Sequence, residues 1–201
     1  AIAAFIILYT ATAGMISIAY IGAVQGVTMA LGITLALGVF WSRADGVQGM
    51  QRILEPSHFE FFGPIGPLEA VGLLLPTFLL VLGDANMYQR FFSARSAGVA
   101  RKAVLWTLAG VAFMESAIIL TAWVASALEP DLEIHGRIIA YAARDHLPPL
   151  LGAVVLTAIM AIILSTAGSY LLAPATALVR DVYQRFVERE ASEARLVFLL
   201  R

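Results

Sequence analysis

Cysteine is absent from this chain of 201 residues, and charged side chains are scarce. Without cysteine there is neither a disulfide framework nor thiolate chemistry. Charged residues make up 13% of the chain and hydrophobic residues 60%, whereas a soluble domain is about one quarter charged and about half apolar. The formal net charge of −1 offers no basic surface to a nucleic acid. This composition predicts an all-α polytopic membrane protein that lies in a lipid bilayer.

The sequence also lacks the patterns that mark common enzyme sites. It has no HExxH zinc motif, no phosphate-binding loop and no nucleophile elbow. Its histidines, His58, His135 and His146, fall in segments that we expect to be loops, without metal-ligand spacing on one helix face. We therefore expect that the protein is not an enzyme.

Long uncharged runs define the membrane spans. The first 42 residues contain no charged side chain, and as a single helix they would extend about 60 Å, about twice the thickness of the hydrocarbon core. We therefore expect a break between Ala13 and Ser17. The chain begins and ends within apolar segments, which we interpret as an internal fragment of a longer protein. The predicted spans cover residues 1–14, 18–41, 67–88, 103–127 and 148–172, followed by a cytoplasmic amphipathic tail over 180–196.

The distribution of charge predicts how these spans cross the membrane. The loops after the second and the fourth span contain more acidic than basic residues. The connector after the third span has no acidic residue. Both this connector and the tail contain four basic residues. These basic residues are Arg90, Arg95, Arg101 and Lys102 in the connector and Arg180, Arg185, Arg189 and Arg195 in the tail. The positive-inside rule places the connector and the tail in the cytoplasm.

Two acidic residues lie inside the predicted spans. Glu115 is near the middle of the fourth span, where an ionisable group costs about 2.5 kcal/mol or more and usually faces the bundle interior. It is either a proton or substrate site or a neutral, hydrogen-bonded structural residue. Asp84 follows Gly83 in the third span, which also contains Pro76, and this combination indicates a kinked or broken helix, as in transporter sites. The alternative is a simple kink whose Asp84 side chain reaches toward Arg90.

A hydroxyl pair, Ser165 and Thr166, lies within the fifth span. Ala161, Ser165, Ser169 and Ala173 recur every four residues and form a stripe of small residues that lets another helix approach closely. In one interpretation the stripe serves packing only, and each hydroxyl bonds to the carbonyl four residues earlier. In the other, the two hydroxyls and freed backbone carbonyls bind a monovalent cation. Oxygen ligands without a carboxylate suit Na⁺ and are weak for Ca²⁺.

Three segments follow one another in an order typical of a known family. AIMAIILSTAGSYLLAPATALVRDVYQRF combines small residues, a Ser-Thr pair, a further Ser and the ending Asp-Val-Tyr. LGDANMYQRFFSARS combines a Gly, a polar residue and Arg-Phe, and ILYTATAGMISIAYIGAVQG runs from Tyr-Thr to a Gln. In this order they resemble the sodium:solute symporter family, which includes the proline, pantothenate and sodium/glucose transporters. The resemblance implies a fragment, covering about core helices four to eight, of the five-plus-five inverted-repeat sodium symporter fold.

The resemblance also implies a sodium site on the fifth span. Ser165 and Thr166 match the hydroxyl pair of the family's helix eight, and Ile162 matches the residue of that helix whose backbone carbonyl binds the ion. Na⁺ is therefore the expected coupling ion. Gly22 stands where members usually have an aspartate that is implicated in a second sodium site, which argues against a second ion at that place.

Further residues fall where members of the family contact or gate their substrate. Thr77 and Leu80 match positions that line the substrate pocket and its inner gate in sugar transporters, and Val111 matches a polar contact on helix seven. Glu115 is one turn from Val111, on the same face. Leu80 replaces a gating aromatic residue, so a stacked sugar is not expected. Asp84 stands where other members have an uncharged polar residue.

Together, these expectations indicate a transporter. We expect a multi-pass protein of the plasma membrane that couples inward sodium flow to the import of a small organic solute by alternating access. One alternative is a symporter-like sensor domain of a signalling protein. Another is a transporter coupled to protons through Glu115 or Asp84. The sequence specifies neither the solute nor an oligomeric state.

Overall fold

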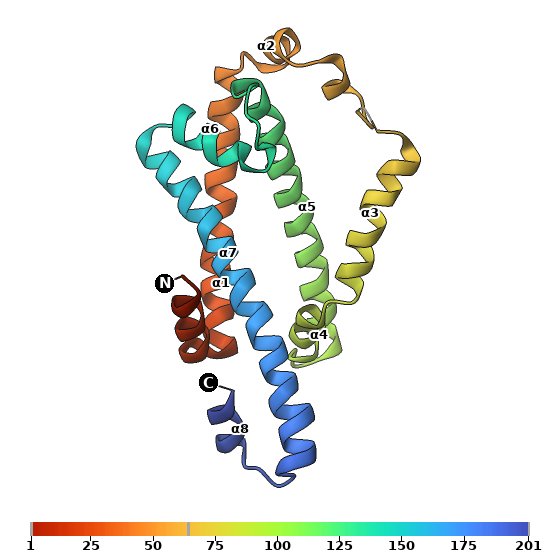
Figure 1. Cartoon of the computed structure of the whole chain (residues 1–201), viewed down its shortest axis with the longest axis vertical. Helices are drawn as coiled ribbons and strands as arrows, with labels where there is room; N and C mark the ends of the chain where they lie inside the picture. The colour runs from red at the N-terminus through yellow and green to blue at the C-terminus, as the bar shows by residue number, and fades with distance from the viewer. Residues whose placement is uncertain (1, 64, 201) are drawn as a thin grey trace.

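The chain consists of long helices joined by short helical and irregular segments (Figure 1). The structure, a computed structural model, describes the backbone at residues 2–63 and 65–200 and the side chains at 20, 22–63, 65–85, 87–88, 91–168, 170–171 and 174–200. The residues so described contain no strand, which confirms the predicted all-helical class. The elements are α1 (Ile2–Arg43), α2 (Gly46–Ile53), η1 (Pro56–Phe59), α3 (Pro67–Leu82), α4 (Ala85–Phe92), α5 (Ala97–Leu128), η2 (His135–Arg137), α6 (Ile138–His146), α7 (Pro149–Ala177), η3 (Leu178–Val187) and α8 (Glu193–Leu199).

Within the described residues, three helices are long and apolar enough to cross a membrane. They are the part of α1 from Gly22 to Arg43, α5, and α7 from Pro149 to Gly168. Such runs form continuous helices because a helix satisfies its own backbone hydrogen bonds in an apolar environment. Local signals set the helix starts: the Ser96 hydroxyl accepts a hydrogen bond from the Val99 amide at 3.3 Å, and Pro149 occupies the first turn of α7. The chain is a membrane protein, as its composition predicts.

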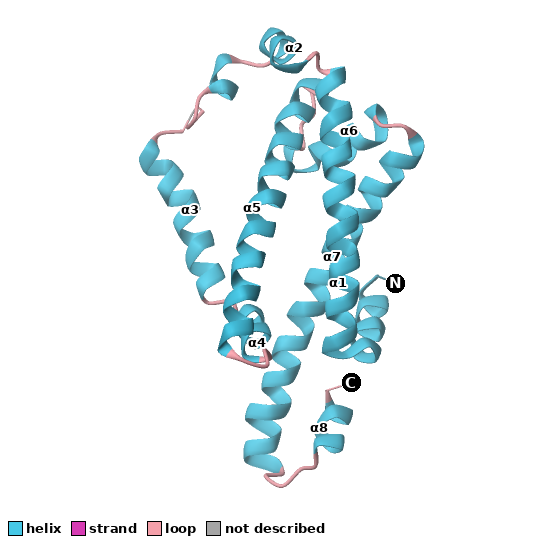
Figure 2. Cartoon of the chain, turned by 180° about the vertical axis from the view of Figure 1, so that it is seen from behind, coloured by secondary structure: helices cyan, strands magenta, loops and turns pink. Residues whose placement is uncertain are grey.

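The helix α1 does not follow one straight axis. Its first turns lie beside the remainder of the helix, and both views show the chain reversing direction before it runs up to α2 (Figure 1, Figure 2). A straight helix of this length would be about twice as long as the hydrocarbon core is thick. The exact position of the break, between Ala13 and Ser17, stays a prediction.

The segment predicted as a span over 67–88 is divided in the structure. α3 has 16 residues and ends at Leu82, so it is about 24 Å long. The Gly83 amide donates to the carbonyl of Leu79 at 3.1 Å and the Asp84 amide to that of Val81 at 3.2 Å, which tightens the last turn. The chain then resumes as α4. Both views show α3 standing apart from α1, α5 and α7 (Figure 1, Figure 2).

Packing is concentrated at the end of the bundle that carries α6. There α1 packs along α7 and α5, and α6 packs against α7 and α5. Many of the buried side chains are alanines, which allow helices to approach closely. The residues buried in this core include Ile33, Ala36, Phe40, Ala44, Met50, Ala117, Val124, Ala125, Ala127, Ala142, Ala143, Leu147 and Val155.

The tail predicted over 180–196 forms two separate helical pieces. The π-helical segment η3 continues directly from α7 and ends at Val187, and α8 begins at Glu193. The Ser192 hydroxyl starts α8 by accepting a hydrogen bond from the Arg195 amide at 3.3 Å. The Arg180 guanidinium donates to both carboxylate oxygens of Glu193, at 2.9 and 2.7 Å. This ion pair ties α8 to η3.

Candidate functional site

The three predicted sodium ligands lie together on α7. Ile162, Ser165 and Thr166 fall within one turn of this uncharged helix, about 20 Å or more from its start at Pro149. The Ser165 side chain is half-buried, whereas those of Thr166 and Ile162 are exposed. The two hydroxyls therefore border a surface of α7 that the described residues leave accessible.

The hydroxyls of this pair behave differently from other hydroxyls in the chain. Thr28 and Thr121 donate to the carbonyl four residues earlier, at 2.9 and 2.6 Å. Among the described residues, Ser165 and Thr166 make no such hydrogen bond to Ala161 or Ile162. The back-bonding that the packing interpretation expects is therefore not formed, and both hydroxyl oxygens are available to a ligand. The Ser169 side chain lies outside the described residues.

A polar side chain on α1 lies at the same level of the bundle. α1 and α7 run in opposite directions and meet at Gly32, where a Cβ atom would be 3.5 Å from Val154 Cγ1 and 3.7 Å from Val155 Cγ2 (Figure 1). Seven residues beyond this contact, about 10 Å along either axis, are Gln25 on α1 and Ile162 on α7. The Gln25 Oε1 atom is buried and has no hydrogen-bond partner among the described residues. Gln25 is not among the site residues expected from the sequence.

The predicted gating residues of the third span are on or directly after α3. Thr77 and Leu80 are exposed, and the Thr77 hydroxyl donates to the Leu73 carbonyl at 3.5 Å. Asp84 is half-buried at the break between α3 and α4, and its carbonyl accepts from the Met87 amide at 3.1 Å. The Arg90 side chain, predicted as its partner, lies outside the described residues. The broken helix that Pro76 and Gly83 predict is present at Gly83.

The remaining candidates lie on α5. Val111 and Glu115 are one turn apart and both exposed. The structure thus gathers the candidates into three groups, on α7, on α5 and around α3, and no extended packing of described residues joins α3 to either of the other helices. Among the candidates in the described residues, only the group on α7 places two side-chain hydroxyls within one turn.

Comparison with known proteins identifies the family. A scan of protein families matches residues 1–201 to the sodium:solute symporter family. The chain belongs to this family. Neither the curated proteins nor the solved structures gave a match. The family match confirms the resemblance carried by the three sequence segments, and membership in a transporter family indicates that this membrane protein moves a solute across the bilayer.

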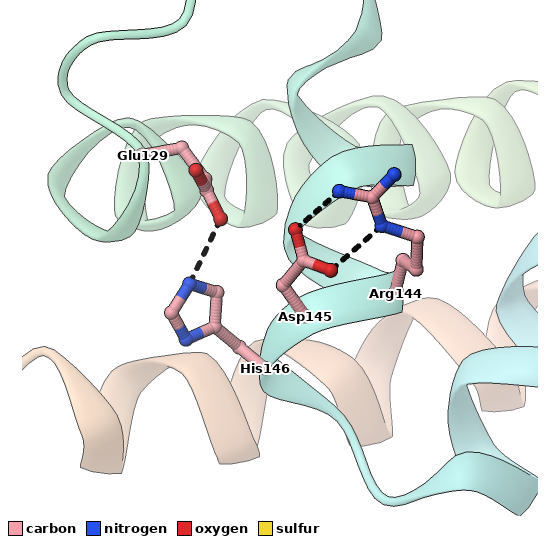
Figure 3. A network of polar contacts seen from close by, with 4 residues as sticks. All are labelled: Glu129, Arg144, Asp145 and His146. Carbon is pink, nitrogen blue, oxygen red and sulfur yellow. Dashed lines mark hydrogen bonds and ion pairs between the residues drawn. The ribbon is translucent and has the colours of Figure 1, made fainter.

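Three ion pairs of this symporter family member, Arg144–Asp145, His146–Glu129 and Arg180–Glu193, lie outside its long apolar helices. At the α6 end, Arg144 donates to both carboxylate oxygens of Asp145, at 2.6 and 2.7 Å. These hydrogen bonds, and then the guanidinium charge, lower the pKa of Asp145 and raise that of Arg144. Nearby, His146 Nε2 lies 2.9 Å from Glu129 Oε1 (Figure 3). This pair joins the end of α5 to the end of α6.

The residues at this end were expected only to lie in loops. Glu129 and His146 flank an acidic segment, but nothing in their spacing of 17 positions predicts contact. A second contact is more remote in sequence: the Trp123 indole donates to the His58 carbonyl, 65 positions away, at 3.0 Å. Among the described residues, no group of three or more His, Cys, Asp or Glu is placed to bind a metal ion.

Proposed function

We propose that this protein imports a small organic solute by sodium-coupled symport, with alternating access of the solute to the two sides of the plasma membrane. The observation that carries the proposal is the hydroxyl pair of α7, which lies in the segment that resembles the family most closely. Both hydroxyls are without a partner among the described residues. The family match over residues 1–201 supports sodium as the coupling ion.

In this proposal Na⁺ is cargo that binds on α7. Ser165 and Thr166 each offer a hydroxyl oxygen, and the Ile162 carbonyl has a second lone pair besides the one used in the helix. These three oxygens suit a hard cation of single charge. They leave its shell incomplete, so the ion takes further oxygens from water, from the solute or from a surface facing α7. Binding then holds α7 against that surface, and release of the ion frees α7 to move.

A direct binding measurement tests the sodium site without knowledge of the solute. We expect Ser165→Ala/Thr166→Ala to weaken binding of radioactive sodium to the protein in lipid nanodiscs by about tenfold or more, because the two lost ligands together remove about 1.4 kcal/mol or more. The matched control is Thr157→Ala, which removes an exposed hydroxyl from the same helix two turns away. Unchanged sodium binding in the double variant would contradict the proposed site.

Transport is tested in proteoliposomes with a panel of radiolabelled solutes. We expect at least one solute to accumulate when sodium is present outside and to fail to accumulate when potassium replaces it. Accumulation that is equal in the two salts would refute sodium coupling. The Thr157→Ala variant should transport like the unaltered protein.

A second candidate coupling ion is the proton, with Glu115 as its carrier. Glu115 is an exposed carboxyl residue in a membrane-crossing helix, without a partner among the described residues, and such residues commonly mark proton or ion paths. Glu115→Gln distinguishes the two. Loss of the pH dependence of uptake would favour proton coupling, whereas intact sodium-dependent uptake in this variant would count against it.

A further inference from the structure

A cavity of about 600 Å³ opens at the α6 end of the molecule. Its walls come from three places in the chain: the segment from α2 to η1, the end of α5, and η2 with the start of α6. Pockets for small organic ligands have volumes of about 300–1,000 Å³. The cavity therefore has room for a small molecule, and it lies at the opposite end of α7 from the hydroxyl pair.

The lining combines apolar surface with negative charge. Ile53, Leu54, Pro130 and Ile138 provide apolar side chains. The described residues of the wall include two carboxylates, Glu55 and Glu129, and no lysine or arginine. A ligand with a positive charge and a compact apolar body complements such a surface, because apolar contact and charge pairing then act together.

The polar atoms of the wall select the kind of cation. Besides the carboxylates, His58, His135 and Ser126 line the cavity, and each can accept a hydrogen bond when the imidazoles are neutral. A protonated amine carries N–H donors that these acceptors can bind. A quaternary ammonium ion has no N–H group and is usually held by aromatic rings, which the described residues of the wall do not provide.

The wall is held in place before any ligand arrives. The Trp123 indole of α5 donates to the His58 carbonyl at 3.0 Å, and the Phe59 ring packs edge-on against Trp123 with ring centroids 5.4 Å apart. These contacts fix η1 against α5. A preformed wall lowers the entropy cost of binding.

The carboxylate of Glu129 is shared between the cavity and His146. His146 Nε2 lies 2.9 Å from Glu129 Oε1, and both side chains are 25% exposed (Figure 3). This contact orients the Glu129 carboxylate before a ligand binds.

We propose that this cavity binds a small protonated amine between Glu129 and Glu55. The site is separate from the proposed sodium ligands, so it can be tested in the absence of sodium. Trp123, whose indole donates to the His58 carbonyl behind the wall, gives an optical signal next to the cavity once the other tryptophans are replaced, as in Trp41→Phe/Trp106→Phe.

The experiment is a fluorescence titration of that protein in sodium-free lipid nanodiscs. Three matched probes are used: benzylammonium, benzyltrimethylammonium, which lacks N–H donors, and benzyl alcohol, which lacks charge. At about pH 8 we expect benzylammonium to bind at least about tenfold more tightly than either control. Equal binding of benzyl alcohol, or no binding of benzylammonium, would overturn the proposal.

Substitutions test which carboxylates bind the amine. Glu129→Gln should weaken benzylammonium binding about tenfold and Glu55→Gln about fivefold, because each keeps the side-chain volume but removes a counter-charge. Glu193→Gln, in the distant tail, is the control and should bind unchanged. Full affinity in Glu129→Gln would refute the assigned role of its carboxylate.

Discussion

The two ends of α7 differ in how the protein surrounds them. Near its start, α7 packs into the buried core with α1, α5 and α6, where Phe40, Val124 and Val155 are fully buried. Further along, the exposed side chains include Ile162 and Thr166. On α3, which stands apart from α7, large apolar side chains such as Leu80 are exposed along the whole helix. One end is fixed by protein contacts, and the other faces lipid or other membrane helices.

This difference matters for a protein that is proposed to move. Closely packed alanines and short connections hold the helices together at the α6 end, so that end is expected to behave as one unit. The candidate sodium ligands lie where α7 has fewer protein contacts, so an ion bound there can change what α7 contacts at a small cost in packing. The two ends are therefore expected to respond differently to the same kind of substitution.

The largest difference is expected for deletion of a phenylalanine ring. Phe40 is 0% exposed in the core, whereas Phe78 on α3 is 61% exposed. Phe40→Ala should lower the free energy of unfolding by about 3 kcal/mol or more, because it leaves a cavity, and Phe78→Ala by less than about 1 kcal/mol. Denaturation of both variants in detergent micelles, followed by circular dichroism, measures the effect. Equal losses would show that the α6 end is not a packed core.

A smaller difference is expected for the addition of one methyl group. A Cβ atom at Gly152 would lie 2.7 Å from the Ala143 carbonyl oxygen, whereas one at Gly110 would meet nothing within 4 Å. Gly152→Ala should therefore push α6 away from α7 and cost about 2 kcal/mol. Gly110→Ala should be neutral or slightly stabilising, since alanine favours a helix. The midpoint of thermal unfolding distinguishes them, and a tolerant Gly152 would contradict the close approach of α6 to α7.

Long apolar segments were the part of the structure that the sequence predicted best. The uncharged runs that become α5 and α7 are long enough to span a bilayer, and few side chains in them compete with helix formation. The break at Gly83 also follows from local chemistry, since Gly and Asp disfavour the continuation of a helix. The division of the tail at Ser192 is a local capping event that a general amphipathic pattern does not reveal.

Contacts between distant residues could not be predicted in the same way. His146 meets Glu129, and Trp123 meets His58 across 65 positions, only because the helices bring them together. Helix patterns specify which face is apolar, but they do not specify which loop residues meet across a bundle. The hydroxyl pair of α7 was predicted because its segment carries a family pattern. The cavity near Glu129 carries no such pattern and became visible only in the folded chain.

The smallest effect is expected at the exposed end of the chain, where Arg180 and Glu193 hold α8 against η3. The hydrogen bond from Arg180, and then its charge, lowers the pKa of Glu193 below its ordinary value of 4.5. A lowered carboxyl pKa stabilises the paired state above the ordinary value, and this stabilisation is lost as the pH falls through the lowered value. Both side chains are substantially exposed, so water screens the pair and the effect on global stability should be slight.

Mobility of α8 is the sensitive measurement of this pair. The chain has no cysteine, so Phe198→Cys provides a single attachment point for a spin label on an exposed position of α8. We expect the label to become more mobile as the pH falls below about 4.5, the ordinary value for the carboxyl group. In Glu193→Gln the label should already be mobile at neutral pH and should change little in acid. A label that responds to acid equally in Glu193→Gln and in Glu190→Gln would show that another group, and not the Arg180 pair, holds α8 in place.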